Sequence, residues 1–488
     1  MSSLSFVMLV AFSGVFSLGI IFSILGSVKL KLAEELKIDD AKVGTLISAL
    51  MFSCLVAVLV IGPLTDMVGF KWIALTGFIL GGACVLLLAS ARSYRTALIA
   101  CLLLGIAAMC VNTVGNTLGL STLFDGKDPA RASNLLNVFF GLGAFLAPMI
   151  IATLLGTMGY KKTVSFIGLL LFVPIVFTIL AKFPEPDAGF VIGDSIGLLT
   201  HPAVLIGGIS LFCYIALESS MAGFLTTYLK SHELSDKKSG LILSAFWISL
   251  MMARLITAIF LTNIDAAKIV PVLAIVACAS IAIMVFASKP SLGILGTLLA
   301  GFSFGPIFPT LVGVCFAKTD AIAAGTGGSV FGLIFAIGLS GGIIVPMLIG
   351  KYAASLSIRQ SLKIALVVSV ALIGASSALW LAVPDVEAKA PEAVEETVVV
   401  EEEGVVGEAV GSVVESVGNV VKEALKEATE AVTVEAPAEA VVETTEVTEE
   451  APAEDAAETP AAEEEDGEES LDDWLETPTT TMSQQQII

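Results

Sequence analysis

Apolar residues gather in long, nearly uninterrupted runs over the first 383 positions, and short polar stretches separate these runs. Each run is close to the ~20 residues that an α-helix needs to cross the hydrocarbon core of a bilayer. The pattern predicts an all-α polytopic membrane protein with twelve transmembrane helices. The predicted spans are Ser5–Val28, Val43–Leu64, Trp72–Ser90, Thr96–Leu120, Asn134–Gly156, Thr163–Ala181, Ala203–Leu229, Gly240–Leu261, Ile269–Ala287, Leu292–Phe316, Ser329–Gly350 and Ser361–Val383.

The last six runs repeat features of the first six at a nearly constant offset. Gly44 and Ser53 of the second run return 196 positions later as Gly240 and Ser249 of the eighth run. A glycine followed by a Pro-Met pair in the fifth run returns in the eleventh run, 198 positions later. Six crossings bring the chain back to the side where it began, so the repeat predicts two parallel six-helix bundles. We expect these bundles over residues 1–182 and 203–383, with a cytoplasmic linker at 183–202.

Composition divides the chain into an apolar body and an acidic tail. The 488 residues are 56% hydrophobic, and the mean hydropathy is +0.93. The net charge of −21 comes from residues 384–488, which contain 31 acidic and 3 basic side chains. Low hydrophobicity and dense negative charge predict a disordered, low-complexity cytoplasmic tail. The body is mildly basic, and nothing in the composition indicates a nucleic-acid partner.

Two segments of the tail have patterns of their own. Valines between Val406 and Val421 fall at helical spacing, which favours a transient helix or a helix that binds a protein partner. The acidic and aromatic segment Leu471–Glu476 resembles a docking peptide, with plain tail as the alternative. The tail is therefore the part of the chain where we expect a protein partner.

The sequence lacks the signatures of an enzyme or a cofactor protein. All seven cysteines lie inside apolar runs and lack the paired spacing of disulfides or zinc sites. The glycine-lysine phosphate loop of an ATP-driven pump is missing as well. We therefore expect no catalytic residues, no metal and no cofactor.

Two charged residues lie deep inside predicted spans. Glu218 is the only such acid, fifteen positions into the seventh span, and an intramembrane carboxyl group is the usual proton carrier of a transporter. The alternative is a neutral glutamic acid that is hydrogen-bonded between helices. Arg254 in the eighth span is the only deep basic residue, and it either reaches the inner membrane surface or contacts the substrate. At ~1.5 Å per residue the two residues differ by roughly 10 Å in depth, so we expect no constitutive ion pair.

Four asparagines form a second polar group. Asn112 and Asn116 share one face of the fourth span, and Asn134 and Asn137 share one face of the fifth. Amides that face a polar cavity bind sugar hydroxyls well, because each offers a donor and an acceptor. Amides that face a neighbouring helix only join the two helices, at ~0.6–2 kcal/mol each. The pattern leaves both interpretations open, and our hypothesis is that these asparagines bind substrate.

A short polar stretch between the second and third spans reads G-x-x-x-D-x-x-G and predicts a short loop. Gly62 permits close helix approach, Gly69 can take a positive φ, and Asp66 can cap the N-terminus of a neighbouring helix. Together with Lys71, the stretch resembles the gating motif between helices 2 and 3 of the major facilitator superfamily. The arginine that normally follows the aspartate is absent, as is the basic residue that follows the second glycine.

The fifth and tenth spans carry a narrower resemblance. The fifth begins Arg131-Ala132-Ser133-Asn134-Leu135-Leu136-Asn137, and the tenth contains Gly301-Phe302-Ser303-Phe304-Gly305-Pro306. Both are similar to helices of the fucose permease-like family, and Tyr214 and Trp247 fit the same pattern. The resemblance implies a twelve-helix sugar:proton symporter of the plasma membrane, with both termini cytoplasmic and with Tyr214, Trp247 and Arg254 at the substrate site. The carboxylates that this family has in helices 1 and 4 are absent, so coupling to protons must depend on Glu218.

The sequence thus predicts a secondary transporter that moves a small polar solute, a monosaccharide, together with protons through a lipid bilayer by alternating access. A facilitator or exporter of a less polar solute is an alternative that the phenylalanine-rich spans favour. A non-transporting sensor or scaffold that uses the acidic tail is a second alternative. The assigned orientation places 15 Lys and Arg in outer loops and 6 in inner loops, opposite to the usual bias, whereas the position of the gating motif favours it.

Overall fold

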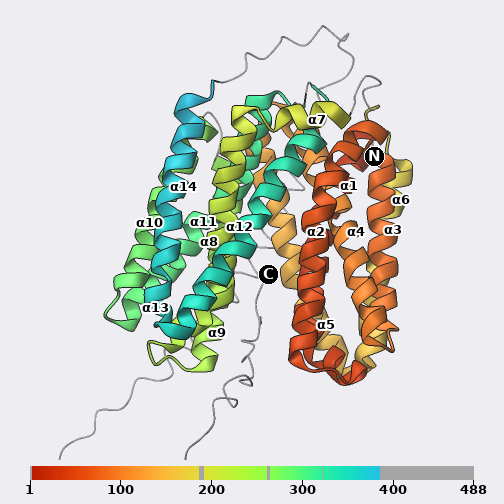
Figure 1. Cartoon of the computed structure of the whole chain (residues 1–488). Coiled ribbons are helices and arrows are strands. Elements are labelled where there is room, and N and C mark those ends of the chain that lie inside the picture. Colours follow the sequence, from red (N-terminus) through yellow and green to blue (C-terminus); the bar gives the residue numbers. More distant parts are fainter. Residues whose placement is uncertain (1–2, 186–191, 261–263, 323, 385–488) are drawn as a thin grey trace, which may run out of the picture.

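The structure is a computed structural model that describes residues 3–185, 192–260, 264–322 and 324–384 (Figure 1). Every regular element in these residues is a helix. The N-terminal half contains α1 (Ser3–Leu36), α2 (Asp40–Val68), α3 (Phe70–Ala89), α4 (Tyr94–Thr122), a 3-10 turn (Leu123–Gly126), α5 (Pro129–Leu170) and α6 (Pro174–Leu180). After α7 (Ile192–Leu198) in the linker, the C-terminal half contains α8 (Pro202–Lys230), α9 (Asp236–Phe260), α10 (Ala266–Phe286), α11 (Pro290–Thr319), α12 (Gly327–Ser355), α13 (Ile358–Ser361) and α14 (Lys363–Ala382). The predicted disorder, helix and docking peptide of the tail lie outside the described residues.

Eleven stretches of the described chain are long and apolar enough to cross a membrane. The longest, Pro129–Leu180, has 52 residues, which at ~1.5 Å per residue is more than twice the ~30 Å hydrocarbon thickness. Gly159 interrupts it with a φ of 72°, which glycine adopts at little steric cost. Beyond this break the Tyr160 hydroxyl donates to Leu88 O of α3 at 3.2 Å. Because of its length and this break, the stretch contains both the fifth and the sixth predicted span. The predicted fold class, two parallel helical bundles, is confirmed.

Matching contacts in the two halves show the repeat. Ser53 Oγ of α2 donates to Leu102 O of α4 at 2.5 Å, and Ser249 Oγ of α9 donates to Leu298 O of α11 at 3.1 Å. Each residue of the second pair stands 196 positions after its counterpart in the first. A serine that bonds a backbone carbonyl of the adjacent helix satisfies its own hydroxyl and joins two helices without a bulky side chain. The same small-residue pattern therefore fixes the same helix pair in each half.

The two halves meet at one end of the bundle. The N-terminus of α1, helix α7 and the C-terminal end of α14 all lie at this end, the top of Figure 1, which we call the linker end. Helix α2 packs against α12, and α5 packs against α9 and α11. At the linker end Gly62 lies directly on Gly328 O, and Gly313 lies on the backbone of Ala130. Neither approach leaves room for a Cβ atom, so the halves are in backbone contact there.

The stretch around the gating motif differs from the predicted loop. Helix α2 continues to Val68 and α3 begins at Phe70, so Gly69 alone lies outside a helix. Gly69 has a φ of 86°, as expected for the glycine of this turn. The predicted loop was wrong because one residue at positive φ is enough to reverse the chain here, and Gly62 and Asp66 remain helical.

Helix α5 packs on α1 through a glycine, and the repeat copies this contact. Gly143 of α5 lies on Phe16 O of α1, and Gly341 of α12 lies on Phe212 O of α8. Lipid tails are as apolar as the side chains of the helices, so close backbone packing is a main source of attraction between membrane helices. Added volume at either glycine would therefore push the two helices apart.

We expect Gly143→Ala to destabilise the fold, because its new Cβ would collide with a backbone oxygen that cannot move alone. Overpacking of this kind costs ~1–3 kcal/mol, so the melting temperature of the purified protein in detergent should fall by several degrees. Gly156→Ala in the same helix is the matched control, since no atom lies within 4 Å of a Cβ built there. Equal melting temperatures for the two variants would contradict the importance of the α1–α5 contact.

Candidate functional site

Three polar side chains meet inside the C-terminal half. The Tyr214 hydroxyl of α8 donates to Glu218 Oε1 at 2.8 Å, and Arg254 Nη2 of α9 lies 3.5 Å from the same oxygen. Arg254 Nε also donates to Gly305 O of α11 at 2.9 Å. We call Tyr214, Glu218 and Arg254 the Glu218 group: the carboxylate oxygen of Glu218 joins α8 to α9, and Arg254 Nε joins α9 to α11.

The ion pair between Glu218 and Arg254 corrects the prediction that these residues lie too far apart in depth. That prediction considered the rise along each helix and not the direction of the side chains. A Cα–Cβ bond tilts toward the N-terminus of its own helix. Because α8 and α9 are antiparallel, Glu218 leans toward the linker end and Arg254 leans away from it. The two side chains converge, and the length of the arginine spans the remaining distance.

Glu218 is the more accessible member of the ion pair. Its side chain is 23% exposed, whereas that of Arg254 is 4% exposed. Arg254 has a second partner besides Glu218, because its Nε donates to Gly305 O, and Gly305 packs closely on Leu250 O of α9. A buried cation left without any partner would be strongly destabilising. Arg254 thus has one partner outside the ion pair, and Glu218 is the member of the pair that solvent reaches more easily.

A row of aromatic rings lies beside the Glu218 group. The ring centroid of Tyr214 is 6.2 Å from that of Phe308, Phe308 is 5.8 Å from Phe335, and Phe335 stacks on Phe331 at 5.3 Å. Phe331 is fully buried, whereas Phe308 is half-buried. The sequence did not reveal this row, because its members come from α8, α11 and α12 and phenylalanine occurs in most of the predicted spans.

Trp247 belongs to the same aromatic cluster. Its ring centroid lies 5.3 Å from that of Phe246, and Phe246 is 6.2 Å from Phe304. Phe304 in turn lies 6.1 Å from Tyr214. The structure thus brings Tyr214, Trp247 and Arg254, which the family resemblance assigned to the substrate site, into one region around α8, α9 and α11.

The four asparagines lie on α4 and α5 in the N-terminal half, each less than one-tenth exposed. Asn116 Nδ2 donates to Asn112 Oδ1 at 2.8 Å, and Asn137 Nδ2 donates to a backbone carbonyl one turn earlier at 2.9 Å. Asn134 Nδ2 reaches across the halves to Thr310 Oγ1 of α11 at 3.0 Å. Within the described residues no hydrogen bond joins these amides to the Glu218 group. The two parts of the predicted site therefore lie in different halves and share no hydrogen bond among the described contacts.

Several buried polar atoms around the asparagines have no hydrogen-bond partner among the described residues. Such atoms cost free energy in an apolar interior. This part of the N-terminal half faces α11 and α12, since Thr117 packs against Gly327 and Asn134 bonds Thr310. These atoms form a polar region between the N-terminal half and α11 and α12. They are Asn112 Nδ2, Thr113 Oγ1, Asn116 Oδ1, Thr117 Oγ1, Ser133 Oγ and Asn134 Oδ1.

The gating motif joins the halves through Asp66. Its Oδ1 accepts a hydrogen bond from Gly328 N and its Oδ2 accepts one from Ser329 N, both at 2.7 Å. These amides belong to the first turn of α12, where they lack partners in their own helix and form the positive end of the helix dipole. The expected capping by Asp66 is confirmed, whereas gating stays a prediction. Lys71 lies exposed near the start of α3, two residues after Gly69.

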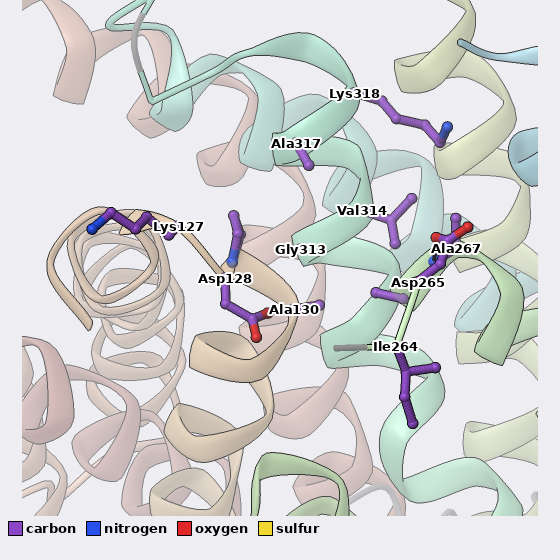
Figure 2. A pocket seen from close by; sticks show the side chains of 12 residues that line it. Lys127, Asp128, Ala130, Ile264, Asp265, Ala267, Gly313, Val314, Ala317 and Lys318 are labelled. Carbon is purple, nitrogen blue, oxygen red and sulfur yellow. Dashed lines mark hydrogen bonds between the residues drawn. The ribbon is translucent and has the colours of Figure 1, made fainter. Parts of the chain in front are cut away.

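A cavity of about 350 Å³ opens at the linker end between the starts of α5 and α10 and the end of α11 (Figure 2). Its charged side chains already serve the fold. Asp128 and Asp265 each cap the first turn of their own helix by accepting a backbone N–H at 3.0 Å. Lys318 Nζ donates to Val383 O at 2.6 Å. The cavity contains no predicted site residue in its lining, so we do not include it in the substrate site.

Comparisons with known proteins find the same architecture. The chain is 24% identical over 304 residues to "Protein TsgA homolog" of Serratia proteamaculans (strain 568), covering 60% of this chain and 75% of the relative. It is 25% identical over 293 residues to the "Glucose/mannose transporter GlcP" of Bacillus subtilis (strain 168), covering 54% and 68%. A crystal structure of the transporter FucP in the outward conformation matches with a TM-score of 0.66 and 16% identity, over 78% of this chain and 99% of that one. A structure of the E. coli fucose:proton symporter FucP matches with a TM-score of 0.64 and 17% identity, over 77% and 98%.

Sequence identity between the solved structures and this chain is low, so these structures establish the shared fold alone. A sequence comparison with whole families is more decisive. The model of the Major Facilitator Superfamily matches residues 8–342, more than half of the chain. Together with the parallel repeat of two helical halves, this match shows that the chain belongs to the Major Facilitator Superfamily.

Proposed function

We propose that this protein is a secondary transporter that moves a monosaccharide across the plasma membrane by alternating access and couples the movement to protons. The observation that supports the proposal is the position of the Glu218 carboxyl group inside a span. Tyr214 and Arg254 bind this group, and it is still partly exposed. Ionisable groups inside membranes are costly and mark functional sites. Membership of the superfamily supports a transporter of a small molecule rather than an enzyme.

In the proposed cycle, proton binding and solute binding share the Glu218 group. A proton on Glu218 removes its charge and weakens the attraction to Arg254 across 3.5 Å. Arg254 Nη2 is then available to a solute hydroxyl, while Arg254 Nε stays bonded to Gly305 O. Loss of the proton restores the ion pair and displaces the solute. The charge of one carboxyl group thereby links the proton to the solute.

The groups around the two halves favour a sugar as the solute. The asparagine amides of the N-terminal half offer donors and acceptors to hydroxyl groups. Phe308 and Phe335 of the C-terminal half offer flat apolar surface to the C–H face of a sugar ring. The names of two similar proteins support this class of solute, since GlcP is named for glucose and mannose and FucP for fucose and protons.

We place the linker end in the cytoplasm. The N-terminus of α1 and the end of α14 both lie at this end, on opposite sides of the bundle in Figure 1, and the gating motif binds the start of α12 at the same end. The acidic tail continues from α14 and would then be available to a cytoplasmic protein partner.

Glu218→Gln should abolish accumulation of the solute against its gradient, because glutamine cannot carry a proton. Equilibrium exchange of labelled solute should remain largely intact, since glutamine preserves the shape of the group. Uptake into proteoliposomes with and without an inward proton gradient measures both properties, with a solute panel that includes glucose, mannose and fucose. Glu35→Gln at an exposed position is the matched control and should behave as the parent protein.

Two outcomes would contradict this assignment. Unchanged uphill uptake by Glu218→Gln would remove Glu218 from the coupling step. Transport that never responds to a proton gradient, in the parent as in the variant, would instead favour a facilitator. The aromatic row beside the Glu218 group would then fit a less polar solute.

Asn137→Ala should raise the apparent KM several-fold, because the loss of one hydrogen bond to the solute costs ~0.5–1.5 kcal/mol. Its melting temperature should stay close to that of the parent, since Asn137 bonds only its own helix among the described contacts. Asn134→Ala should raise the KM and also lower the melting temperature, because Asn134 joins α5 to α11 through Thr310. Initial uptake rates and thermal unfolding in detergent measure the two effects.

Thr310→Val is the matched variant for Asn134, since it removes the partner hydroxyl and keeps the amide. If Thr310→Val reproduces the whole effect of Asn134→Ala, the amide acts as a helix contact and not as a substrate ligand. If Asn137→Ala lowers the melting temperature and leaves the KM unchanged, Asn137 is a packing residue as well.

A further inference from the structure

A second charged side chain crosses between the halves at the linker end. Arg131 lies in the first turn of α5, and its Nε donates to Ala258 O in the last turn of α9 at 2.8 Å. Helix α5 belongs to the N-terminal half and α9 to the C-terminal half. The bond is therefore one of the contacts that join the two halves, and neither residue belongs to the Glu218 group or to the gating motif.

The surroundings of Arg131 suit this contact. The last carbonyl groups of a helix have no partner in their own helix and form the negative end of its dipole, so a cation there is favourable. The Arg131 guanidinium also lies 4.1 Å from the ring centroid of Phe124, which holds it by a cation–π interaction. Asp128 already caps the start of α5 by accepting from Arg131 N. The guanidinium is thus not needed for its own helix and can serve the neighbouring one.

The internal repeat makes this contact the counterpart of the Asp66 contact. Gly62 of α2 corresponds to Ala258 of α9 at the offset of 196, and Ser329 of α12 corresponds to Arg131 of α5 at the offset of 198. At the α2–α12 interface an acid of the N-terminal half caps a helix N-terminus of the C-terminal half. At the α5–α9 interface a base of the N-terminal half caps a helix C-terminus of the C-terminal half. The two interfaces use charges of opposite sign on helix ends of opposite sign.

We propose that Arg131 is a positioning residue of the transport cycle, which holds the linker end closed by capping the C-terminus of α9. The inference rests on alternating access as part of the proposed function. A contact that joins the two halves must break when the linker end opens, so it stabilises the closed state alone. Removing the contact shifts the equilibrium between the closed and the open state by the free energy that the contact contributes to the closed state. Arg131 acts on the solute only through this balance.

Leu255 provides a reporter for the opening of this interface. Its side chain is 3% exposed and packs on Val138 of the opposite half and on Met251. It comes three residues before Ala258 in α9, so it lies farther from the linker end than the Arg131 contact. We would place Leu255→Cys in the full chain in lipid nanodiscs and follow its labelling by a membrane-impermeant maleimide. The same chain without Leu255→Cys gives the background from the seven native cysteines, of which six are buried. The assay contains neither solute nor proton gradient, so its result does not depend on the solute or on Glu218.

Arg131→Ala should speed this labelling by about tenfold, as expected when a charge-assisted hydrogen bond is lost from one of two states. Arg131→Lys keeps the positive charge without the planar guanidinium, so its labelling should be intermediate. Asp66→Asn, which weakens the other interface, should also speed labelling. Lys127→Ala is the matched control, because it removes an exposed cation close to Arg131 whose ion pair among the described residues is with Asp125 of the same half.

Labelling of Arg131→Ala at the parent rate would overturn the proposal, even if the variant had a lower melting temperature, because a purely structural role predicts that result. An equally large increase of the labelling rate in Lys127→Ala would also overturn it, because removal of any cation at this end would then have the same effect. If Arg131→Ala does not yield folded protein, Arg131→Gln and Arg131→Lys decide the question. Equal labelling of those two variants would contradict capping by charge.

Discussion

Close approach of helix backbones is the constraint on which this structure depends. In a bilayer the hydrophobic effect does not drive helices together, so they associate where small residues let their backbones touch. Gly143 on Phe16 and Gly341 on Phe212 serve this purpose within the halves, and Gly62 on Gly328 serves it between them. Asp66 reaches α12 beside the contact of Gly62 with Gly328, and Arg254 reaches α11 at Gly305, which packs closely on Leu250 O. The glycines therefore bring these side chains within reach of the neighbouring helix.

Polar chemistry is divided unequally between the two repeats. The C-terminal half holds the charged Glu218 group and a row of aromatic rings, whereas the N-terminal half holds neutral amides and hydroxyls. The repeat itself provides the framework for this division, since equivalent helices occupy equivalent places in each half. Phe308, for instance, stands 196 positions after Asn112. A solute between the halves would meet amides on one side and rings with an ion pair on the other.

Few specialised residues are needed for the polar contacts that join the two halves at the linker end. Asp66 and Arg131 bind helix ends, whose unpaired backbone groups are present in any helix and need no matching side chain. Each such contact requires the side chain to lie at the end of the helix that it binds, so in the proposed cycle the contact is lost when the halves separate. The unpartnered polar atoms of α4 and α5 belong to the same half as Asp66 and Arg131 and face α11 and α12. In the proposed cycle, opening of the linker end would break the capping contacts and expose these atoms to water.

The sequence by itself determined the spans, the repeat and several local features, because these depend on residues close together in the chain. Hydrophobic runs specify the crossings, Gly69 specifies the turn after α2, and Asp66 could be recognised as a helix cap. Only the tertiary structure decided which side chains from distant helices meet. The ion pair of Glu218 with Arg254 contradicted a depth estimate, and the contact of Arg131 with Ala258 left no signal in the sequence. Both depend on how far each helix is rotated and on where its side chains lean, and packing against other helices determines those quantities.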